Sequence, residues 1–497
     1  MTGKKLIIIG AGVAGLATGY YASKNGYTVD IFELHDKPGG MCTSWKRKDY
    51  IFDYCIHNLA GTSPECGIHQ IWRELGALYG TDVINHDEFV SIESFHSEAL
   101  HWYTDLERLG KHLKEIAPED SAAIDELIGA ARKFAGADLF ATQLGGLSRM
   151  LKAIPHVSAI NRWSQVTMGQ FAGRLKSPFL RRALIHVMYD IPGDVAPMTA
   201  LLLFMAGMSK KDLGWPAGGS LALSMRIEKR LLDAGGSIHY KSRVEKILVE
   251  NNRAVGVRLN DGNEYRADYI ISAADGYDTI YNMLDGQYVT GAIDKYYGSV
   301  GDSSPFGLII FLGLTCEFPD VPHALTLLFD DSFDVGEIEQ DSLHVVTYGS
   351  ETGLVPEGKA IIKIEAQAKY PYWMKRREAD LGAYREEKKR IADRLIELIA
   401  PRFPGLREHI EVTDISTPPT AERFTGNRYG WQAGPPEENA AEIQRKGLSK
   451  TLPGLDGFFH VGQWSMATLG VSSVAIMGHN LVKELCKKDG RRFRTDH

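Results

Sequence analysis

The sequence has few cysteines, no long apolar segment and no excess of basic residues. Its five cysteines are scattered over 497 residues, and none form a C-x-x-C pair, so we expect reduced thiols, no disulfide framework and no metal site. No apolar stretch reaches the roughly 18 residues of a membrane-spanning helix. The net charge of −7 argues against a nucleic-acid partner, which needs a basic surface.

The beginning of the chain imitates an export signal, because Lys4 and Lys5 precede an apolar run of small residues that ends at Ala22. The glycines within this run, however, keep a spacing that a signal peptide does not need. We therefore expect a cytoplasmic protein, either free or bound peripherally to the inner face of the membrane.

A glycine-rich turn connects a short apolar strand, predicted at Lys5–Ile9, to a helix predicted at Ala14–Asn25. The turn reads Gly10-Ala-Gly-Val-Ala-Gly15. In this context G-x-G-x-x-G is a dinucleotide fingerprint: the first glycine permits the tight turn, the second lets the pyrophosphate approach and the third lets the helix pack on the sheet. The start of the helix then offers free N–H groups and a partial positive charge to the phosphates.

Glu33 ends the next predicted strand, Thr28–Glu33, eighteen residues after the last glycine of the turn. A carboxylate at this spacing binds the adenosine ribose hydroxyls and disfavours the 2′-phosphate of NADP. Three features favour FAD over NAD. The motif lies at the extreme N-terminus, Pro38-Gly-Gly40 follows closely, and a distant strand, Phe458–Val461, leads through a turn into a helix at Val471–Cys486 that could supply N–H groups to a flavin.

Pieces of one domain therefore lie at both ends of the chain and in its middle, where a helix at Leu221–Ala234 precedes a series of strands that ends at Tyr269–Ser272. The predicted fold is α/β. A discontinuous Rossmann-like FAD-binding domain comprises residues 1–79, 215–289 and 451–497. An α+β substrate domain comprises residues 80–214 and 290–450, with a mixed sheet and a helical region that could face a membrane.

Several motifs resemble those of the phytoene desaturase-like flavoproteins, which include carotenoid desaturases, carotenoid isomerases and retinol saturases. The resemblance covers nearly the whole chain. It rests on Ile7–Gly15, Glu33, Lys37-Pro-Gly-Gly-Met41, Phe52–Asp53, Pro216-Ala-Gly-Gly219, the strands of Val244–Asp275, Gly457–Gly462 and Gly470–Gly478.

The resemblance implies FAD as the cofactor and assigns residues to it. The ADP half would be held by Gly10, Ala11, Gly12, Ala14, Gly15 and Glu33. The pyrophosphate and ribityl chain would lie along Gly39, Gly40 and Met41, the adenine would meet the backbone of Val244, and the far side of the flavin would be lined by Gly462, Gln463, Val471, Ser472 and Ser473. Many members differ in having arginine for Met41, an Asp-x-Gly-Pro-like element for Asp53–His57 and small residues for Gln463–Trp464.

The family chemistry is flavin-mediated hydride exchange with a carbon of the substrate. The resemblance therefore implies desaturation, saturation or cis–trans isomerisation of an apolar polyene or isoprenoid, with a quinone or oxygen as electron acceptor if the enzyme is a desaturase. His57 is our candidate for proton transfer, against the alternative of a histidine bonded to backbone under the flavin. Asp53 is expected to be a structural acceptor. Trp431 and Trp464 are candidates for the wall of the substrate channel, although aromatic core packing is the commoner role.

The segment 141–189 has seven basic residues and no acidic one, although the protein is acidic overall. Interleaved apolar residues predict amphipathic helices of the kind that lie on anionic membranes; the alternatives are a solvated basic face or an oligomer contact. The basic residues are Arg149, Lys152, Arg162, Arg174, Lys176, Arg181 and Arg182. The apolar ones include Leu147, Met150, Leu151, Ile154, Trp163, Phe171, Leu175 and Phe179.

Two other functions on the same fold stay open at this point. One is an amine-oxidase-like flavoenzyme, which would need an aromatic cage beside the flavin and an acidic entrance. The other is a prenyl-lipid escort protein that has lost FAD, against which the intact glycines and Glu33 argue. Further along the chain, Lys369–Arg394 predicts one charged amphipathic helix, and Thr417–Phe424 predicts either a turn or a cap over the substrate cavity.

Overall fold

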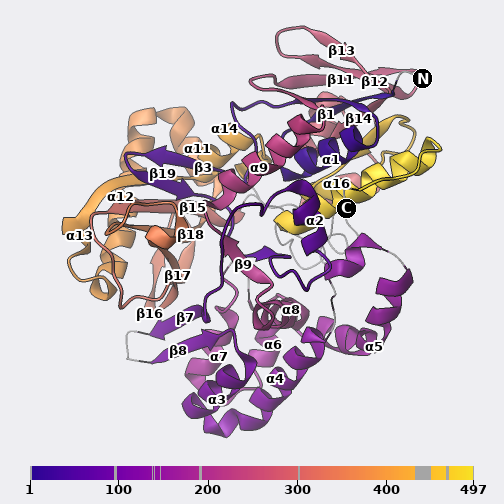
Figure 1. Ribbon diagram of the computed structural model, residues 1–497. Helices are drawn as coiled ribbons and strands as arrows, with labels where there is room; N and C mark the ends of the chain where they lie inside the picture. Colours follow the sequence, from indigo (N-terminus) through magenta and orange to yellow (C-terminus); the bar gives the residue numbers. More distant parts are fainter. Residues whose placement is uncertain are drawn as a thin grey trace.

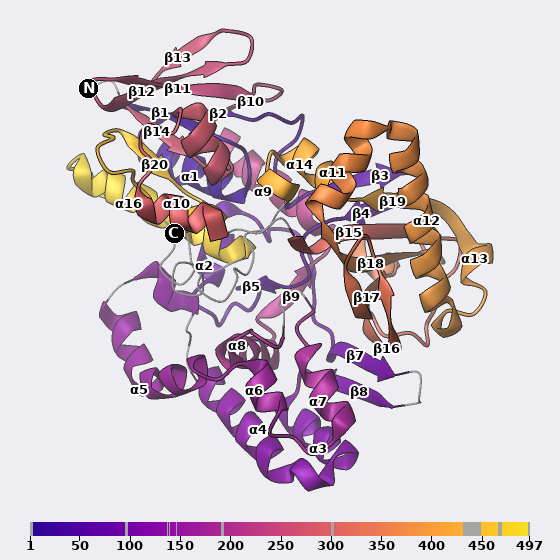
Figure 2. The ribbon, with the colours of Figure 1, turned by 180° about the vertical axis from the view of Figure 1, so that it is seen from behind.

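The computed structural model describes residues 3–94, 98–136, 138, 140–145, 147–189, 193–299, 303–430, 449–465 and 470–495. Figures 1 and 2 show three parts: a sheet-and-helix layer that contains both ends of the chain, a second sheet covered by α11 and α12, and a helical part, α3 to α8.

The first part is built on a parallel five-stranded sheet. Its strands follow the order β10 (Ser237–His239), β2 (Thr28–Phe32), β1 (Lys5–Ile9), β14 (Tyr269–Ser272) and β20 (Phe458–His460). Within β1, Leu6 and Ile8 join the hydrophobic core on one face, and Ile7 and Ile9 join the core on the other. A sheet with both faces covered explains why its strands read as continuous apolar runs.

Helices α1 (Val13–Lys24), α9 (Gly219–Asp233) and α16 (Val471–Lys488) share the core on one face, and α2 (His69–Leu75) lies against it. The opposite face carries a meander and a helix. These are β11 (Val244–Glu250), β12 (Arg253–Leu259), β13 (Glu264–Arg266) and α10 (Gly291–Ser299). Helix α10 lies within 290–450, the stretch given above to the substrate domain, but Ile293, Tyr296 and Tyr297 pack with the dinucleotide-domain core. The boundary proposed at residue 290 therefore needs to move past this helix.

The second sheet is mixed, because β16 pairs with β7 in parallel and the other neighbours are antiparallel. Its order is β19 (Ile410–Ser416), β15 (Ser303–Leu314), β18 (Ala360–Lys369), β17 (Glu339–Tyr348), β16 (Ala324–Asp334), β7 (Glu88–Ser94) and β8 (Ala99–Tyr103). One face packs against α11 (Tyr370–Ala379), α12 (Leu381–Ile399) and α13 (Leu406–His409). The other face meets the hairpin of β3 (Ser44–Arg47) and β4 (Tyr50–Asp53). The predicted α/β fold class, with a Rossmann-like domain and a mixed second sheet, is confirmed.

The helical part has a core of its own. It consists of α3 (Leu106–Ile116), α4 (Ser121–Ala135), α5 (Leu147–Ser164), α6 (Met168–Ala172), α7 (Pro178–Ile185) and α8 (Met198–Ser209). It joins the rest through β9 (Leu213–Pro216), which pairs with β5 (Leu59–Ala60) and β6 (Val83–Ile84). No helix in the described part of the chain combines the length and the hydropathy of a membrane-spanning segment.

The amphipathic interpretation of 141–189 was wrong for four of the eight apolar residues named above. Trp163, Phe171, Leu175 and Phe179 are buried in the helical core, whereas Leu151 and Ile154 on α5 are exposed. The side chains of Leu147, Arg149, Met150 and Lys152 lie outside what the structure describes. Distant acids also balance part of the basic charge, because Arg162 and Arg174 both pair with Glu126 of α4, and Arg182 pairs with Asp341 of β17.

Two segments differ locally from the prediction. Lys369–Arg394 forms two helices, because the chain leaves the helical conformation at Asp380, whose carboxylate then accepts hydrogen bonds from the first N–H groups of α12. Thr417–Phe424 forms a helix, α14 (Pro418–Thr425), since its prolines occupy the first turn, where no N–H donor is needed.

Candidate functional site

The glycine turn leaves the start of α1 open. Gly10 has a φ of +96°, which favours glycine, and a β-carbon on Gly15 would lie 2.0 Å from the carbonyl oxygen of Gly10. Gly12 caps the helix without a side-chain hydrogen bond, and the first turn contains no acidic residue. The N–H groups of α1 are therefore available to an anion.

Glu33 lies directly beside this turn, with only 6% of its surface exposed. Its Oε2 accepts a hydrogen bond from the Ala11 N–H at 2.7 Å, and its Oε1 accepts one from the His35 N–H at 2.8 Å. Burial raises the pKa of Glu33, and these backbone donors oppose the rise. Each carboxylate oxygen keeps a second lone pair, so both can still accept a hydroxyl.

The second glycine pair lies against the first turn. The Gly39 N–H donates to the Ala11 carbonyl at 2.9 Å, and a β-carbon on Gly40 would lie 3.5 Å from Cα of Gly12. Met41, the next residue, is partly buried against the core. The first glycine turn and the Gly39–Gly40 pair therefore lie side by side and form one narrow wall of backbone atoms.

The C-terminal segment reaches the same edge of the sheet. Helix α16 packs closely along α1, since a β-carbon on Gly478 would lie 2.7 Å from the Thr18 nitrogen, and Figure 2 shows the two helices side by side. A β-carbon on Gly462, after β20, would lie 3.6 Å from Cβ of Ala14. Because β1 and β20 are parallel strands of one sheet, the helices that follow them both begin at its carboxyl edge.

The first residues of α16 are Val471, Ser472 and Ser473. Val471 is half-buried, Ser473 is buried, and the Ser472 hydroxyl donates to the Ala60 carbonyl at 2.8 Å, which ties the helix start to β5.

Val244 begins β11 two residues after Ser242, whose N–H donates to the Glu33 carbonyl at 2.8 Å, so its backbone follows closely on Glu33, and its side chain is buried with Ile7 and Phe32. Gln463 begins a short 3-10 turn, η7 (Gln463–Ser465), whose Trp464 is buried against Tyr429. Trp431 falls outside the described residues.

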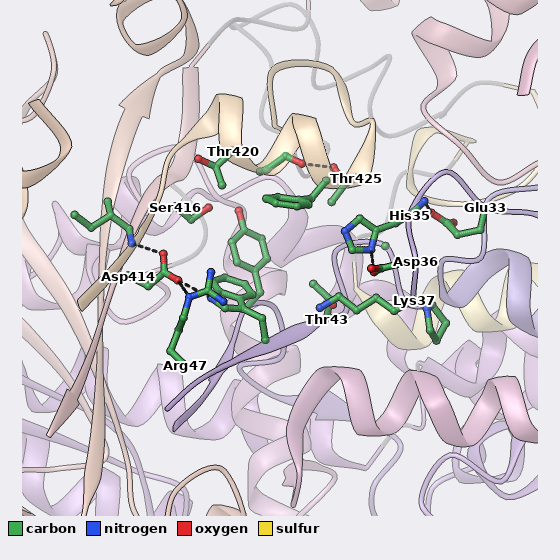
Figure 3. A pocket seen from close by; sticks show the side chains of 17 residues that line it. Glu33, His35, Asp36, Lys37, Thr43, Arg47, Asp414, Ser416, Thr420 and Thr425 are labelled. Atoms are coloured by element: carbon green, nitrogen blue, oxygen red, sulfur yellow. Dashed lines mark hydrogen bonds and ion pairs between the residues drawn. The ribbon is translucent and has the colours of Figure 1, made fainter. Parts of the chain in front are cut away.

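A cleft of about 350 Å³ opens beside Glu33 and Gly40. Figure 3 shows α14 along one side of it, Glu33 at one end and the Arg47–Asp414 ion pair at the other, where the two charged groups are 2.8 Å apart. The Trp45 indole N–H also donates to Asp414, at 3.0 Å. The segment Thr417–Phe424 thus lines a cleft between the two domains and contributes Thr420, Ala421 and Phe424 to its wall.

His57 belongs to a buried ionic cluster. Its Nε2 lies 3.0 Å from Oε1 of Glu365 and also 3.0 Å from Nζ of Lys363, and these two charged groups are themselves 2.6 Å apart. Lys363 also donates to the Tyr54 carbonyl at 3.2 Å. A single nitrogen of His57 thus faces a donor and an acceptor, and it can accept from one or donate to the other but not both.

The charges within this cluster depend on each other. Burial alone would raise the pKa of Glu365, but the neighbouring charges of His57 and Lys363 hold it well below its usual range. Asp53 is also buried, which raises its pKa to about 6, and it accepts a hydrogen bond from the Ser220 N–H at 3.0 Å, consistent with a structural acceptor.

Sequence reasoning missed Lys363 and Glu365, although a signal was present. They are two residues apart in Ala360–Lys369, an otherwise apolar strand whose Ile362 and Ile364 pack under α12. Alternation places the two charged side chains together on the other face. Two opposite charges at this spacing in a buried strand predict an ion pair, but no residue near them in the sequence indicates that His57 also contacts both groups.

Comparison with known proteins relates the chain to one group of enzymes. Residues 8–75 match the NAD(P)-binding Rossmann-like domain. Prolycopene isomerase of Daucus carota is 24% identical over 488 residues, 95% of this chain and 78% of that protein. The neurosporene-forming phytoene desaturase of Cereibacter sphaeroides is 24% identical over 439 residues, 84% of this chain and 82% of that protein. These likenesses confirm the predicted resemblance to the phytoene desaturase-like flavoproteins.

The chain also resembles solved structures along nearly its whole length. An oxidoreductase from Methanosarcina mazei superposes with a TM-score of 0.61 and 18% identity, covering 96% of this chain and all of the other. At that identity the likeness bears on the fold alone.

Proposed function

We propose that this chain is an FAD-dependent oxidoreductase that desaturates, saturates or isomerises carbon–carbon bonds of an apolar polyene or isoprenoid. The observation that carries the proposal is the meeting of two glycine segments, the Glu33 carboxylate and the starts of α1 and α16 at one sheet edge. The carotenoid-named relatives support the substrate class.

The residues at this edge fit FAD. Backbone N–H groups at the start of α1 would hold the pyrophosphate beside Gly39 and Gly40, and Glu33 would accept the ribose hydroxyls with its remaining lone pairs. Gly462 and the start of α16 would approach the flavin ring. When bound, FAD supplies hydride transfer to or from a substrate carbon. A quinone or oxygen would accept the electrons if the reaction is a desaturation.

We assign proton transfer to His57. Its ring lines a small cavity together with Phe89 and Trp215, so it faces space that a substrate could enter. The donor Lys363 and the acceptor Glu365 at Nε2 control where the imidazole carries its proton, and thereby which nitrogen can give or take one on the cavity side.

Replacing His57 with glutamine should lower turnover by about 100- to 10,000-fold, the usual contribution of a general acid or base. Flavin content should not change, because the charged partners of His57, Lys363 and Glu365, lie on β18 of the second sheet, whereas the glycine turn and Glu33 belong to the first. Stopped-flow flavin reduction or reoxidation would measure the effect. The matched control is His112→Gln, a half-buried histidine in the helical part. Equal rates for both variants would remove His57 from the mechanism.

The reaction itself can be tested with purified yellow holoprotein incubated anaerobically with a lipid extract that contains polyenes. Product mass then separates the reactions, since desaturation removes about two daltons, saturation adds about two, and isomerisation leaves the mass unchanged while retention time shifts. No spectral change of the flavin and no altered polyene would contradict the proposed function.

We also propose that one face of α5 rests on an anionic membrane. Leu151, Ile154 and Val157 recur at helical spacing on this face and are 54%, 61% and 46% exposed. The apolar side chains would enter the lipid boundary, and basic residues of 141–189 would attract its charge. An apolar substrate could then enter without crossing water.

Ile154→Glu should lower binding to vesicles that contain phosphatidylglycerol by about tenfold, because it places a charge in the centre of the inserted face. Cosedimentation at low salt measures this. Met225→Glu is the control, since Met225 on α9 is comparably exposed at 52% but lies on the dinucleotide domain. Vesicle binding that is the same for neutral and anionic lipid, or for both variants, would contradict the membrane assignment.

A further inference from the structure

A cavity of about 320 Å³ lies on the second sheet, away from the glycine turn. Its inner wall includes Tyr189, Thr326, His344 and Glu365, and Ile185 and Met188 add apolar surface. Its mouth carries carboxylates, of which Asp341 is paired with Arg182 at 3.0 Å. Glu365 thus belongs both to this cavity and to the cluster around His57.

Two of the residues that line this cavity each have a buried polar atom without a hydrogen-bond partner among the described residues: Oε2 of Glu365 and Nε2 of His344. Their residues are 2% and 4% exposed and lie directly opposite each other in β18 and β17. Opposite residues of an antiparallel pair have β-carbons about 5 Å apart. Because an unpaired buried polar atom is unfavourable, two such atoms on neighbouring residues that line one cavity indicate a ligand that reaches them when it binds.

The local charge identifies the kind of ligand. Lys363 already neutralises Glu365, because its Nζ lies 2.6 Å from Oε1. A cationic ligand would therefore add a buried charge that no carboxylate compensates, which disfavours a cation. Burial lowers the pKa of His344 to about 3, so the ring is neutral near pH 7. Its Nδ1 lies 3.2 Å from the Thr326 hydroxyl. If that hydroxyl donates, the proton of His344 is on Nε2, and the site offers one acceptor and one donor side by side.

We propose that this cavity binds a hydroxyl group at one end of the substrate, so that the enzyme acts on an isoprenoid or polyene alcohol. The hydroxyl donates to Oε2 of Glu365 and accepts from Nε2 of His344. Its hydrocarbon chain extends past Tyr189, whose ring stacks on His344 with 3.3 Å between centroids and meets His57 edge-on at 5.1 Å. This assignment rests on the proposed function, whose substrate it narrows.

The test compares three ligands on the holoprotein: geranylgeraniol, the hydrocarbon with hydrogen in place of its hydroxyl, and the corresponding primary amine. Each is titrated in detergent micelles and followed by tryptophan fluorescence. The alcohol should bind about tenfold or more tightly than the hydrocarbon, since the latter leaves both polar atoms unpaired. His344→Phe keeps a ring against Tyr189 and should reduce the ratio to about one. His323→Phe, which replaces a half-buried histidine that lines two neighbouring cavities, should preserve this affinity ratio.

Equal affinity of the wild type for the alcohol and the hydrocarbon would overturn the hydroxyl site but not the proposed function. The same holds if His344→Phe keeps the wild-type preference for the alcohol over the hydrocarbon. An amine that binds more tightly than the alcohol would also overturn the hydroxyl site. If none of the three isoprenoids binds, the proposed function fails as well. The comparison on the wild type needs no variant to fold.

Discussion

Replacing Lys363 with methionine should lower the free energy of unfolding by about 3–5 kcal/mol, the usual result of removing one partner of a buried ion pair. Lys363 is fully buried and Glu365 nearly so. The variant leaves the Glu365 carboxylate in a low-dielectric interior with only His57 and no lysine beside it. Urea denaturation followed by circular dichroism would measure the loss.

Two further variants show whether the pairing is responsible. Lys363→Met combined with Glu365→Leu removes both charges and should recover most of the stability, because an apolar pair can replace a buried ion pair. Lys389→Met breaks an exposed pair with Asp393 on α12 and should cost less than about 1 kcal/mol. If Lys363→Met lowers the free energy of unfolding no more than Lys389→Met does, the buried pair contributes nothing to the stability of the fold.

The same pair predicts a dependence on pH. The pKa of Glu365 is held below its usual range in the folded protein, so its contribution to stability is complete above the unfolded pKa, about 4.3. As the pH falls below that value, protons bind the unfolded chain preferentially and the contribution is lost. The double variant should therefore lose less stability than the wild type between about pH 5 and 3.

Gly15→Ala should yield a protein with little or no bound flavin. The new β-carbon would lie 2.0 Å from the Gly10 carbonyl oxygen, which is backbone and cannot turn away, so α1 must move from the sheet edge. Overpacking of this kind costs about 1–3 kcal/mol, which corresponds to roughly 5- to 150-fold weaker FAD binding if the strain falls on the bound state. Flavin released by denaturation and measured by chromatography gives the occupancy.

Gly129→Ala is the matched control, because Gly129 lies within α4 and a β-carbon there meets no atom within 4 Å. This change should leave flavin content unaltered and raise stability by roughly 0.5–1 kcal/mol, the difference between the two residues in a helix. Normal flavin content in Gly15→Ala would mean that the cofactor does not depend on the close packing of α1.

Local rules predicted the parts of the fold in which neighbouring residues decide the outcome. The strand at Lys5–Ile9, the glycine turn and the helix at Val471–Lys488 follow from apolar runs and glycine spacing, and each lies within a few residues of its prediction. At Asp380 these rules failed. The charged helical pattern continued through this residue, but aspartate is more favourable as an N-cap than inside a helix, and Asp380 caps α12.

The candidate site was less predictable, because its residues come from segments that are far apart. His57 meets Glu365 across 308 positions, and His344 faces Glu365 only through strand register. The basic segment illustrates the same limit. No acidic residue within 141–189 compensates its charge, but Glu126 of a preceding helix and Asp341 of a distant strand pair with its arginines. Hydrophobic periodicity also does not distinguish a helix face that packs into the core, such as that of Trp163 and Phe171, from a face that contacts lipid.

The pairing of α1 with α16 has a consequence for synthesis of the protein. The first helix is translated long before the segment after Gly470, yet Lys4 is bonded to Asp489 and the Arg491 guanidinium to the Asn25 carbonyl. During translation, the N-terminal half of the proposed nucleotide site is therefore incomplete until α16 has been synthesised. Stalled nascent chains should retain flavin only after that helix has emerged from the exit tunnel, so premature termination anywhere upstream would produce a colourless polypeptide.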